Sequence, residues 1–250
     1  FLSTSGPVIS IPGDLSGMLT NLQDRDVFFI DEIHRVNTTV EEYLYSAMED
    51  FKIDILIDSG PNARTVRIDL EPFTLVGATT RLGNISTPMR DRFGAIFRLD
   101  FYQKDEIFKI LKRTASILEM NVQDDALTEI AGRSRGTPRI ANRVLKRVRD
   151  FAQVKNVKEI SLENARNSLD SIGIDENGLE NMDRKILKNL IVNYNGGPTG
   201  GKSLAISINE DIQTIEDVYE PYLIKEGFIE RTSRGRIATD KAYALFDLKK

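Results

Sequence analysis

Two adjacent acids follow a short apolar run in the segment VFFIDEIH, residues 27–34. Asp31 and Glu32 come directly after four apolar residues, a pattern typical of a strand buried on both faces of a parallel sheet. A strand-end aspartate beside a nucleotide can hold Mg²⁺, usually through water, because Mg²⁺ prefers oxygen ligands and keeps its hydration. The neighbouring glutamate can orient or deprotonate an attacking water. On this pattern alone, two solvated acids at the start of a loop are the more common case.

Two hydroxyl residues end the next apolar run, FTLVGATT at 73–80. Thr79 and Thr80 would lie at the carboxyl edge of a parallel sheet, where open α/β sheets bind ligands. They can therefore position the same water as the acids. Threonine is also an ordinary strand residue, so the pair by itself is weak evidence.

Arginines occur at two further places suited to anions. Arg90 and Arg92 stand in RDRFG, and arginine carries a fixed fork of donors that suits phosphate oxygens. A surface salt-bridge cluster is an equal alternative there. In GTPRIANR, Thr137 is a good N-cap and Pro138 suits the first helical position. Arg139 would then lie in the first turn, beside free N–H groups, so an anion site is favoured.

The composition excludes several other chemistries. The chain of 250 residues has no Cys and one His, His34, which argues against disulfides, thiolate or histidine zinc sites and a Ser-His-Asp triad. We expect His34 to be a structural or switch residue rather than a catalyst. The net charge of −4 argues against a generic nucleic-acid binder, but residues 133–149 and 231–236 are basic stretches without an acid. Such patches indicate localised anion contacts. No apolar run is long enough to span a membrane.

The elements that must position these residues fall into three regions with an overall α/β class. Residues 1–102 combine buried strands with a helix after Asn37, and residues 53–70 alternate with period two around SGPN, which predicts a hairpin standing out from the sheet. Residues 103–174 show helical periodicity. Residues 175–250 show three helical segments followed by a hairpin, a winged-helix pattern. The predicted helices cover 104–118, 126–134, 138–154, 161–172, 181–194, 202–208 and 214–227, and the last hairpin covers 228–239.

Taken together, these residues resemble the RuvB family, the Holliday-junction branch-migration ATPases of the AAA+ class. The resemblance rests on FIDEIHRVN, AMEDF, PFTLVGATTR, RDRFG, RSRGTPRIANR, TIEDVYEPYL and GFIERTSRGRIAT, which occur in this order across the whole chain. It implies part of an AAA+ P-loop NTPase core, then an all-α lid domain and a winged-helix DNA-binding domain. It also implies an ATP-driven motor subunit for branch migration in recombination and repair.

The resemblance implies roles for individual residues. Asp31 and Glu32 match the Walker B pair, with Asp31 toward Mg²⁺ and ATP as the nucleotide. Thr80 matches sensor 1, Arg92 the arginine finger acting on a neighbouring subunit's nucleotide, and Arg139 sensor 2. The positions matching residues that line the family's nucleotide site are Glu49, Asp50, Phe51 and Tyr102, and those matching its DNA-contacting arginines are Arg231 and Arg236.

The same resemblance implies partners and a location. Six copies would form a ring around double-stranded DNA at Holliday junctions. The hairpin at 53–70 would dock on RuvA, and RuvC would join the resolving complex. The family is cytoplasmic, bacterial and associated with the nucleoid.

One departure from the family pattern is large. The family carries a Gly-rich phosphate loop, GxxxxGK[ST], upstream of these motifs, and this sequence has none in that place. GGPTGGKS at 196–203 has the right spacing but follows an amphipathic helix rather than a buried strand, so we reject it as the nucleotide loop. We expect an N-terminally truncated family member, which would be inactive alone. The alternatives are a non-catalytic DNA-binding or assembly module and, ranked last, a clamp-loader-like ATPase.

Overall fold

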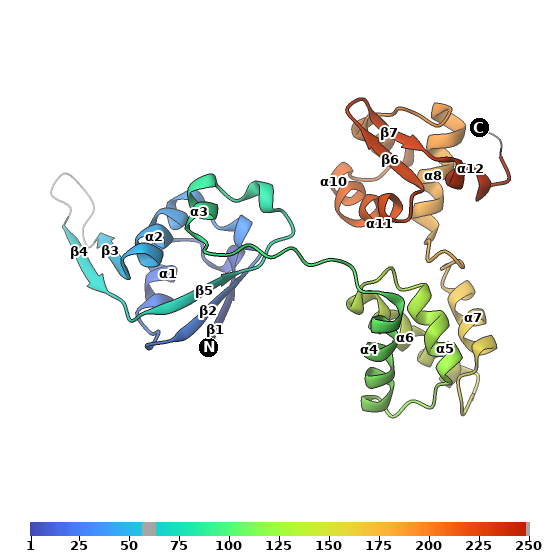
Figure 1. Ribbon diagram of the computed structural model, residues 1–250, viewed down its shortest axis with the longest axis horizontal. Helices are drawn as coiled ribbons and strands as arrows, with labels where there is room; N and C mark the ends of the chain where they lie inside the picture. The colour runs from blue at the N-terminus through green and yellow to red at the C-terminus, as the bar shows by residue number, and fades with distance from the viewer. Residues whose placement is uncertain (57–63, 249–250) are drawn as a thin grey trace. The chain divides into compact units, whose positions relative to one another are not determined.

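The computed structural model describes residues 1–56 and 64–248 of the chain (Figure 1). The chain divides into two compact units, Phe1–Arg98 and Leu99–Lys250. The predicted hairpin tip, SGPN at 59–62, lies outside the described residues. Within the described residues, the helices are all too short or too polar to cross a membrane.

The first unit is built on a parallel sheet of three strands. β1 (Leu2–Ser5), β2 (Asp26–Asp31) and β5 (Phe73–Gly77) are ordered β1-β2-β5, so the strand predicted at 27–30 is the central one. β1 was not among the predicted strands. The strand predicted over 73–80 ends at Gly77. Because the strands are parallel, the residues that follow β2 and β5 lie at the same edge of the sheet.

The expectation that β2 is buried on both faces is wrong. Phe28 and Ile30 are completely buried, whereas Phe29, which points to the other face, is only half-buried. The reason is that α1 (Pro12–Leu19) and α2 (Thr38–Glu49) contribute their apolar side chains to the core on the Phe28 side. In the described part of this unit, the apolar core therefore lies on one face of the sheet.

Short helical turns connect the strands of this unit. α2 begins where predicted, because the Asn37 side chain accepts a hydrogen bond from the Val40 N–H at 2.9 Å. Its apolar positions Val40, Leu44 and Ala47 are buried against the sheet. The remaining turns are η1 (Gly6–Val8), η2 (Ile33–Arg35), η3 (Leu82–Asn84) and α3 (Thr87–Arg92).

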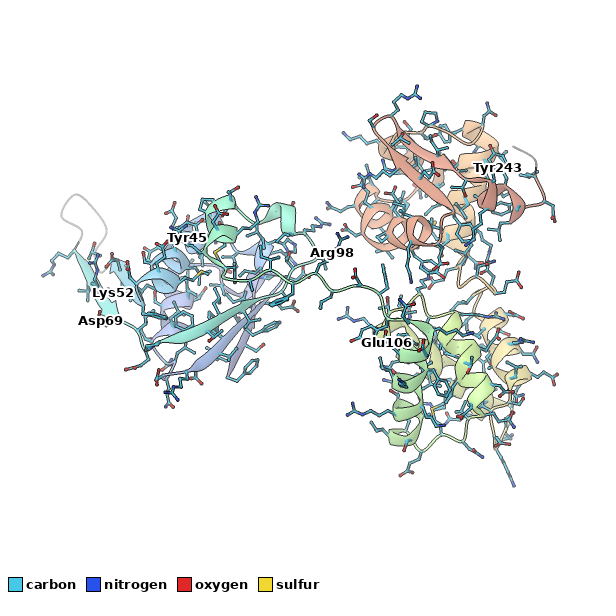
Figure 2. The ribbon with its side chains drawn as sticks, in the orientation of Figure 1. Tyr45, Lys52, Asp69, Arg98, Glu106 and Tyr243 are labelled. Atoms are coloured by element: carbon cyan, nitrogen blue, oxygen red, sulfur yellow. The ribbon has the colours of Figure 1, made fainter. Side chains whose placement is uncertain are left out.

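The predicted hairpin is confirmed as a sheet of its own. β3 (Lys52–Leu56) and β4 (Thr65–Asp69) pair antiparallel with each other. Lys52 and Asp69 are opposite each other where the hairpin leaves the unit and form an ion pair at 3.8 Å (Figure 2). Ile53 is completely buried and anchors the base of the hairpin in the core of the unit.

The second unit begins with a helical region. Its helices are amphipathic and bury one apolar stripe each in a common core. The four helical predictions here are confirmed, and the one over 138–154 has the observed bounds. The helices are α4 (Lys104–Ile117), α5 (Asp124–Gly132), α6 (Pro138–Val154) and α7 (Leu162–Ser171).

The rest of the second unit has a separate apolar core and the expected helices and hairpin. β6 (Ile229–Thr232) and β7 (Gly235–Ala238) pair antiparallel, and α12 (Asp240–Ala244), which was not predicted, follows them. The helices before the hairpin are α8 (Asn181–Tyr194), α9 (Gly201–Ile208), α10 (Ile212–Thr214) and α11 (Glu220–Lys225).

The helix predicted over 214–227 is not continuous. A π-helical turn, Ile215–Tyr219, joins α10 to α11. Pro221 lies in the first turn of α11 and has no backbone N–H to donate to the preceding turn. Such a missing donor is a usual cause of a wider turn or a kink within a helix.

Candidate nucleotide and DNA sites

The acids predicted to serve a nucleotide lie at the carboxyl end of β2. The Asp31 side chain is exposed, and its Oδ1 accepts a hydrogen bond from the Glu32 N–H at 2.9 Å. Glu32 has left-handed backbone angles, φ 50° and ψ 42°, which are uncommon for a residue with a side chain. The chain thus turns sharply after the strand and leaves both carboxyl groups at the sheet edge.

The turn after β2 is held by backbone contacts from two sides. The Ile33 N–H donates to the Ala78 carbonyl at 3.0 Å, and the Ala78 N–H donates to the Ile30 carbonyl at 2.9 Å. Gly6 lies against the carbonyl of Glu32, where a Cβ would stand 2.5 Å from that oxygen. These contacts fix the acids relative to the residues that follow β5.

The two threonines after β5 have different surroundings. Thr79 Oγ1 lies 2.8 Å from Nδ1 of His34, and the imidazole Nε2 lies 3.4 Å from Oε2 of Glu32. Thr80 is exposed, as expected for a residue that would meet a ligand. The structure therefore brings Asp31, Glu32, Thr79 and Thr80 to one edge, together with His34.

This edge fits a hydrated Mg²⁺. Asp31 supplies one exposed carboxylate, and no group of three or more His, Asp or Glu residues within the described ranges is arranged to hold a metal. A single carboxylate is enough when the ion keeps its waters and is also bound by nucleotide phosphates.

Arg92 and Glu49 form a second cluster, away from the acids. Arg92 Nε lies 3.2 Å from Glu49 Oε1, and the guanidinium carbon lies 4.4 Å from the centre of the Tyr45 ring. Tyr45 points from α2 toward α3, where it contacts Ser86 at 3.1 Å (Figure 2). Tyr45 was not predicted, because a tyrosine on a helix carries no motif of its own.

The residues after Glu49 lie near the start of β5. Asp50 is exposed, and Phe51 packs edge-on against Phe73, with the ring centres 5.9 Å apart. α2 begins near the carboxyl end of β2, and Glu49 lies roughly 16 Å further along its axis, at 1.5 Å per residue. Within one copy, the structure does not bring Glu49, Asp50 and Phe51 to the acids.

In the second unit, two predicted nucleotide residues lie close together. The Tyr102 N–H donates to the Gly136 carbonyl at 2.9 Å, just before α6 begins. Arg139 is exposed in the first turn of that helix. Thr137 occupies the N-cap position, but its side chain makes no capping hydrogen bond. The first N–H groups of α6 are thus not satisfied by their cap residue.

Two arginines next to Arg139 are buried in ion pairs. Arg135 is 6 % exposed, and its guanidinium donates to Asp183 and to the Gly178 carbonyl. Asp183 is completely buried, and burial raises its pKa against the opposing effect of Arg135. Arg133 pairs with Glu129 at 2.7 Å. Sequence patterns did not identify these partners, which are 48 and 4 residues away along the chain.

The hairpin of β6 and β7, called the wing below, holds three arginines in different surroundings. Arg236 is 6 % exposed, and its guanidinium contacts Glu220 and Glu216, each at 2.5 Å. Arg231 is half-exposed and lies 3.3 Å from Glu216. Arg234 is exposed in the turn, and its guanidinium has no ion-pair partner in the described part of the chain. A DNA contact by Arg231 or Arg236 stays a prediction. Arg234, the third arginine of this hairpin, was not among the predicted DNA contacts.

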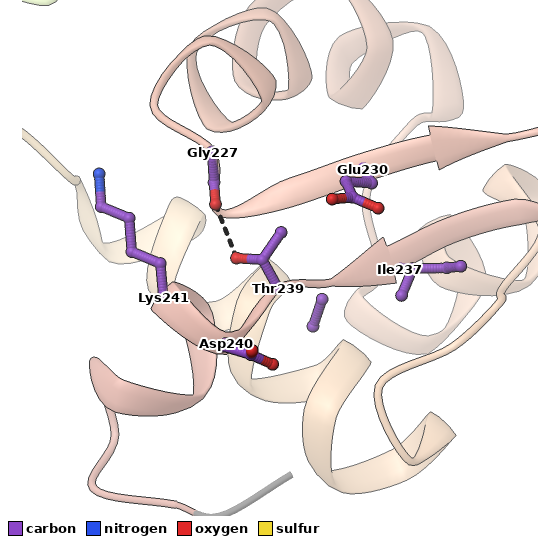
Figure 3. Close-up of a pocket in the computed structure, with 7 residues that line it drawn as sticks. Gly227, Glu230, Ile237, Thr239, Asp240 and Lys241 are labelled. Atoms are coloured by element: carbon purple, nitrogen blue, oxygen red, sulfur yellow. Dashed lines mark hydrogen bonds between the residues drawn. The ribbon is translucent and has the colours of Figure 1, made fainter.

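A shallow hollow lies beside the wing, between the end of α11 and α12. Thr239 donates to the Gly227 carbonyl at 2.6 Å across it (Figure 3). Acidic and basic side chains share its rim, so it has no marked preference for an anion or a cation. The lining residues are Gly227, Glu230, Ile237, Ala238, Thr239, Asp240 and Lys241.

The loop GGPTGGKS has a structural use that explains its glycines. It connects α8 to α9, and the Thr199 N–H donates to the Arg236 carbonyl at 3.0 Å. A Cβ on Gly197 would stand 2.2 Å from that same carbonyl oxygen. The glycines allow the wing strand to approach, which supports rejecting this loop as a phosphate cradle.

Comparisons with known proteins cover the whole chain. Residues 1–99 match the Holliday junction DNA helicase RuvB P-loop domain, residues 102–175 the RuvB AAA lid domain, and residues 176–247 the RuvB C-terminal winged helix domain. These matches confirm the predicted fold class. The predicted domain limits of 102 and 174 stay predictions.

Individual relatives agree with the family models. The RuvB subunit of Flavobacterium johnsoniae is 59 % identical over 96 % of this chain, and that of Salinibacter ruber is 56 % identical over 98 %. In both cases the match spans 71 % of the relative. The solved structure of the Thermotoga maritima RuvB Holliday junction branch migration motor superposes with a TM-score of 0.87 at 48 % identity. It covers 100 % of this chain and 78 % of that one. The chain belongs to the RuvB family of Holliday junction branch migration ATPases.

Proposed function

We propose that the chain is the ATP-driven DNA motor subunit of a Holliday junction branch migration complex. The observation that carries this proposal is the meeting of Asp31 and Glu32 with Thr79 and Thr80 at one sheet edge. Carboxylates and hydroxyls at that edge are suited to a nucleotide with its metal and an attacking water. Membership of a P-loop ATPase family supports nucleotide binding at this place.

Each residue at the edge has one task in this proposal. Asp31 would hold Mg²⁺, which would supply positive charge to the phosphate oxygens. Glu32 orients the attacking water and accepts its proton. Thr80, exposed beside them, contacts the terminal phosphate. In the second unit, Arg139 and Tyr102 lie together at the start of α6 and are suited to contact a nucleotide.

The Arg92 cluster points to a site shared between copies. Arg92 and Glu49 contact each other at the end of α2 that is remote from Asp31, so Arg92 does not reach the acids of its own sheet edge. A finger arginine that cannot serve its own site can serve a neighbour's, as expected for a ring of six. Glu49, Asp50 and Phe51 would then line the neighbour's nucleotide site as well.

Mixing of two inactive variants tests the shared site in the full-length gene product. We expect Arg92→Ala to lower hydrolysis by about 10³–10⁵-fold, the usual cost of losing an arginine finger. Asp31→Asn should also be inactive. Mixed rings should regain part of the activity, because an Asp31→Asn copy still offers Arg92 to an intact Asp31 site. Absence of rescue at every mixing ratio would show that Arg92 does not act across the interface.

The remaining contacts of the motor follow from the two hairpins. The described arms of the 53–70 hairpin form an independent sheet, which supports a docking role toward RuvA. The wing presents Arg231 and Arg234 to solvent, which suits contacts to DNA phosphates rather than to base edges. Both assignments, like the association with RuvC, are part of the proposal.

A further inference from the structure

The only histidine of the chain lies between two groups of the proposed site. His34 has a side chain that is 7 % exposed, and both ring nitrogens face polar atoms. Nδ1 lies 2.8 Å from Thr79 Oγ1, and Nε2 lies 3.4 Å from Glu32 Oε2. The ring therefore connects the residue after β2 with the residue after β5.

The hydrogen bonds of Thr79 give this connection a direction. Thr79 Oγ1 already accepts a hydrogen bond from the Arg81 N–H at 2.9 Å. Its own hydroxyl proton can then be donated to Nδ1 of His34. A neutral imidazole with an acceptor at Nδ1 carries its proton on Nε2. The Nε2–H consequently faces the Glu32 carboxylate, whereas the other tautomer would place a lone pair against that negative charge.

The backbone leaves the imidazole little freedom to move. Glu32 adopts left-handed angles, and its carbonyl accepts a hydrogen bond from the Arg35 N–H at 2.8 Å, which starts the η2 turn. The Ile33 N–H is bonded to the Ala78 carbonyl. His34 thus lies in a turn that is tied to the segment carrying Thr79, and its ring is largely enclosed.

The separation between Nε2 and the carboxylate suits a positioning contact. At 3.4 Å it is within ion-pair range but longer than an N–H···O hydrogen bond of about 2.7–3.2 Å. Glu32 keeps its second oxygen, and its side chain is 37 % exposed. The carboxylate is therefore oriented without losing the oxygen that would receive a proton from water.

We propose that His34 is a positioning residue for ATP hydrolysis, holding the Glu32 carboxylate and linking it to the sensor segment through Thr79. This inference rests on the proposed function, because it requires Glu32 to act on the attacking water. Movement of the segment after β5, where Thr80 contacts the terminal phosphate, is transmitted through Thr79 and His34 to the base.

Two amide substitutions separate the two arms of the imidazole. The Gln side-chain nitrogen can occupy the place of Nε2, and the Asn amide can occupy only that of Nδ1. In the full-length gene product, we expect His34→Asn to lower kcat by up to about 10²-fold, the cost of a misplaced catalytic group, with KM for ATP changed less than twofold. His34→Gln should recover at least a tenth of the wild-type kcat. Equal kcat values for the two variants, or a loss confined to KM, would overturn the proposal.

A double-substitution cycle separates positioning from mere folding. Glu32→Gln alone should lower kcat by about 10²–10⁴-fold. Adding His34→Asn to it should cost nothing further, because a positioning residue has no task once the base is gone. Full additivity would mean that His34 acts independently of Glu32, which would overturn the proposal. If Glu32→Gln itself leaves kcat intact, Glu32 is not the catalytic base and the proposed function is contradicted. If only the His34 variants are silent, the inference fails and the function stands.

A readout without ATP tests the tautomer directly. Because His34 is the only histidine among the 250 residues, its ring nitrogens can be observed in the chain itself by ¹⁵N-detected NMR. We expect the proton on Nε2, and we expect Thr79→Val to weaken that preference. A ring protonated only on Nδ1 would contradict the arrangement.

Discussion

Two arginine-rich segments of the second unit look alike in sequence and differ in structure. Segment 133–139, RSRGTPR, and segment 231–236, RTSRGR, each carry three arginines and no acid. In the first, Arg133 and Arg135 are buried in ion pairs and Arg139 is exposed. In the second, Arg236 is buried while Arg231 and Arg234 face solvent. An acid-free basic stretch therefore does not tell which arginine is available for a phosphate.

The acids that pair with these arginines explain the difference. Arg135 meets Asp183 of α8, and Arg236 meets Glu216 and Glu220, which precede the wing. Burying a guanidinium without such a partner would be costly, whereas an exposed arginine needs none. The buried arginines connect elements of the fold, whereas the exposed ones remain accessible to solvent.

Segment 133–139 connects the two regions that hold the separate apolar cores of the second unit. The core of the four-helix region and the core of the winged-helix region are separate. Polar contacts join them, among them the Arg135–Asp183 pair and a hydrogen bond from Arg143 to Glu180 at 3.2 Å. Arg139, the arginine predicted to contact the nucleotide, lies four residues after Arg135 and thus close in sequence to this junction.

The largest effect should come from breaking that junction. Arg135→Ala leaves Asp183 buried without its partner, and breaking a buried pair costs about 3–5 kcal/mol. Arg139→Ala, four residues away but exposed, should change the free energy of unfolding by less than about 0.5 kcal/mol. Urea unfolding followed by far-UV circular dichroism measures both.

A control is needed because Arg135 itself has a positive φ of 57°. Asp183 lies in α8 with ordinary helical geometry, so Asp183→Ala should be destabilising by a similar amount through loss of the same pair. If both variants are as stable as Arg139→Ala, the junction is not held by this ion pair.

A smaller effect should distinguish the arginines of the wing. Arg236→Ala removes hydrogen bonds to the charged carboxylates of Glu220 and Glu216. A hydrogen bond to a charged group contributes about 1.5–3 kcal/mol, so this variant should lower the free energy of unfolding. Arg234→Ala should leave stability unchanged and weaken binding to duplex DNA. Its slope of log affinity against log salt should fall by about 0.9, the loss of one phosphate contact.

Fluorescence anisotropy with a labelled duplex at several salt concentrations measures that slope. Arg231→Ala should act in the same direction as Arg234→Ala, since the Arg231 side chain is 55 % exposed. A salt slope that is unaltered by Arg231→Ala and Arg234→Ala would place the DNA contact elsewhere than on the wing.

The smallest effect should appear in the pH dependence of the free energy of unfolding, through the pair of Glu129 with Arg133. Burial acts to raise the pKa of Glu129, but hydrogen bonds from Arg133 and Arg166 outweigh it, and the pKa lies below its ordinary value of 4.5. The ionised carboxylate therefore stabilises the fold above pH 4.5, and this contribution is lost as the pH falls through the folded-state pKa. Glu129→Gln should lower the free energy of unfolding by about 1 kcal/mol at pH 7. The difference in this free energy between the variant and the unsubstituted chain should disappear in acid.

Unfolding curves at a series of pH values between 7 and 3 test this sign. Asp124→Asn is a matched control, because Asp124 pairs with Lys112 at 2.8 Å but is 63 % exposed, and exposed pairs contribute little. A gap for Glu129→Gln that widens toward low pH would contradict the assignment.

The sequence was most informative where periodicity and motif length were large. The helix over 138–154 was predicted with its observed bounds, because Ala141, Val144, Leu145 and Val148 repeat on one face and Pro138 marks its start. The strand at 27–30 and the wing hairpin were also found. β1 was missed because LSTS is short and polar, and α12 because five residues hold too little pattern.

The candidate site was predictable in its residue types but not in its contacts. Asp31, Glu32, Thr79 and Thr80 could be expected at one edge, since parallel strands end together. The bridging position of His34 could not be expected, because it depends on the left-handed turn at Glu32 and on the register of β2 against β5.

The sequence by itself determined the family, the fold class and the types of functional group that are present. These groups are acids after one strand, hydroxyl side chains after the next strand and arginines in acid-free stretches. Only the tertiary structure decided which of those groups are committed to one another. The physical reason is distance along the chain. Asp183 lies 48 residues from Arg135, Glu220 lies 16 from Arg236, and Thr79 lies 45 from His34. Local patterns report on a few turns of chain, whereas burial and pairing are settled when distant elements pack.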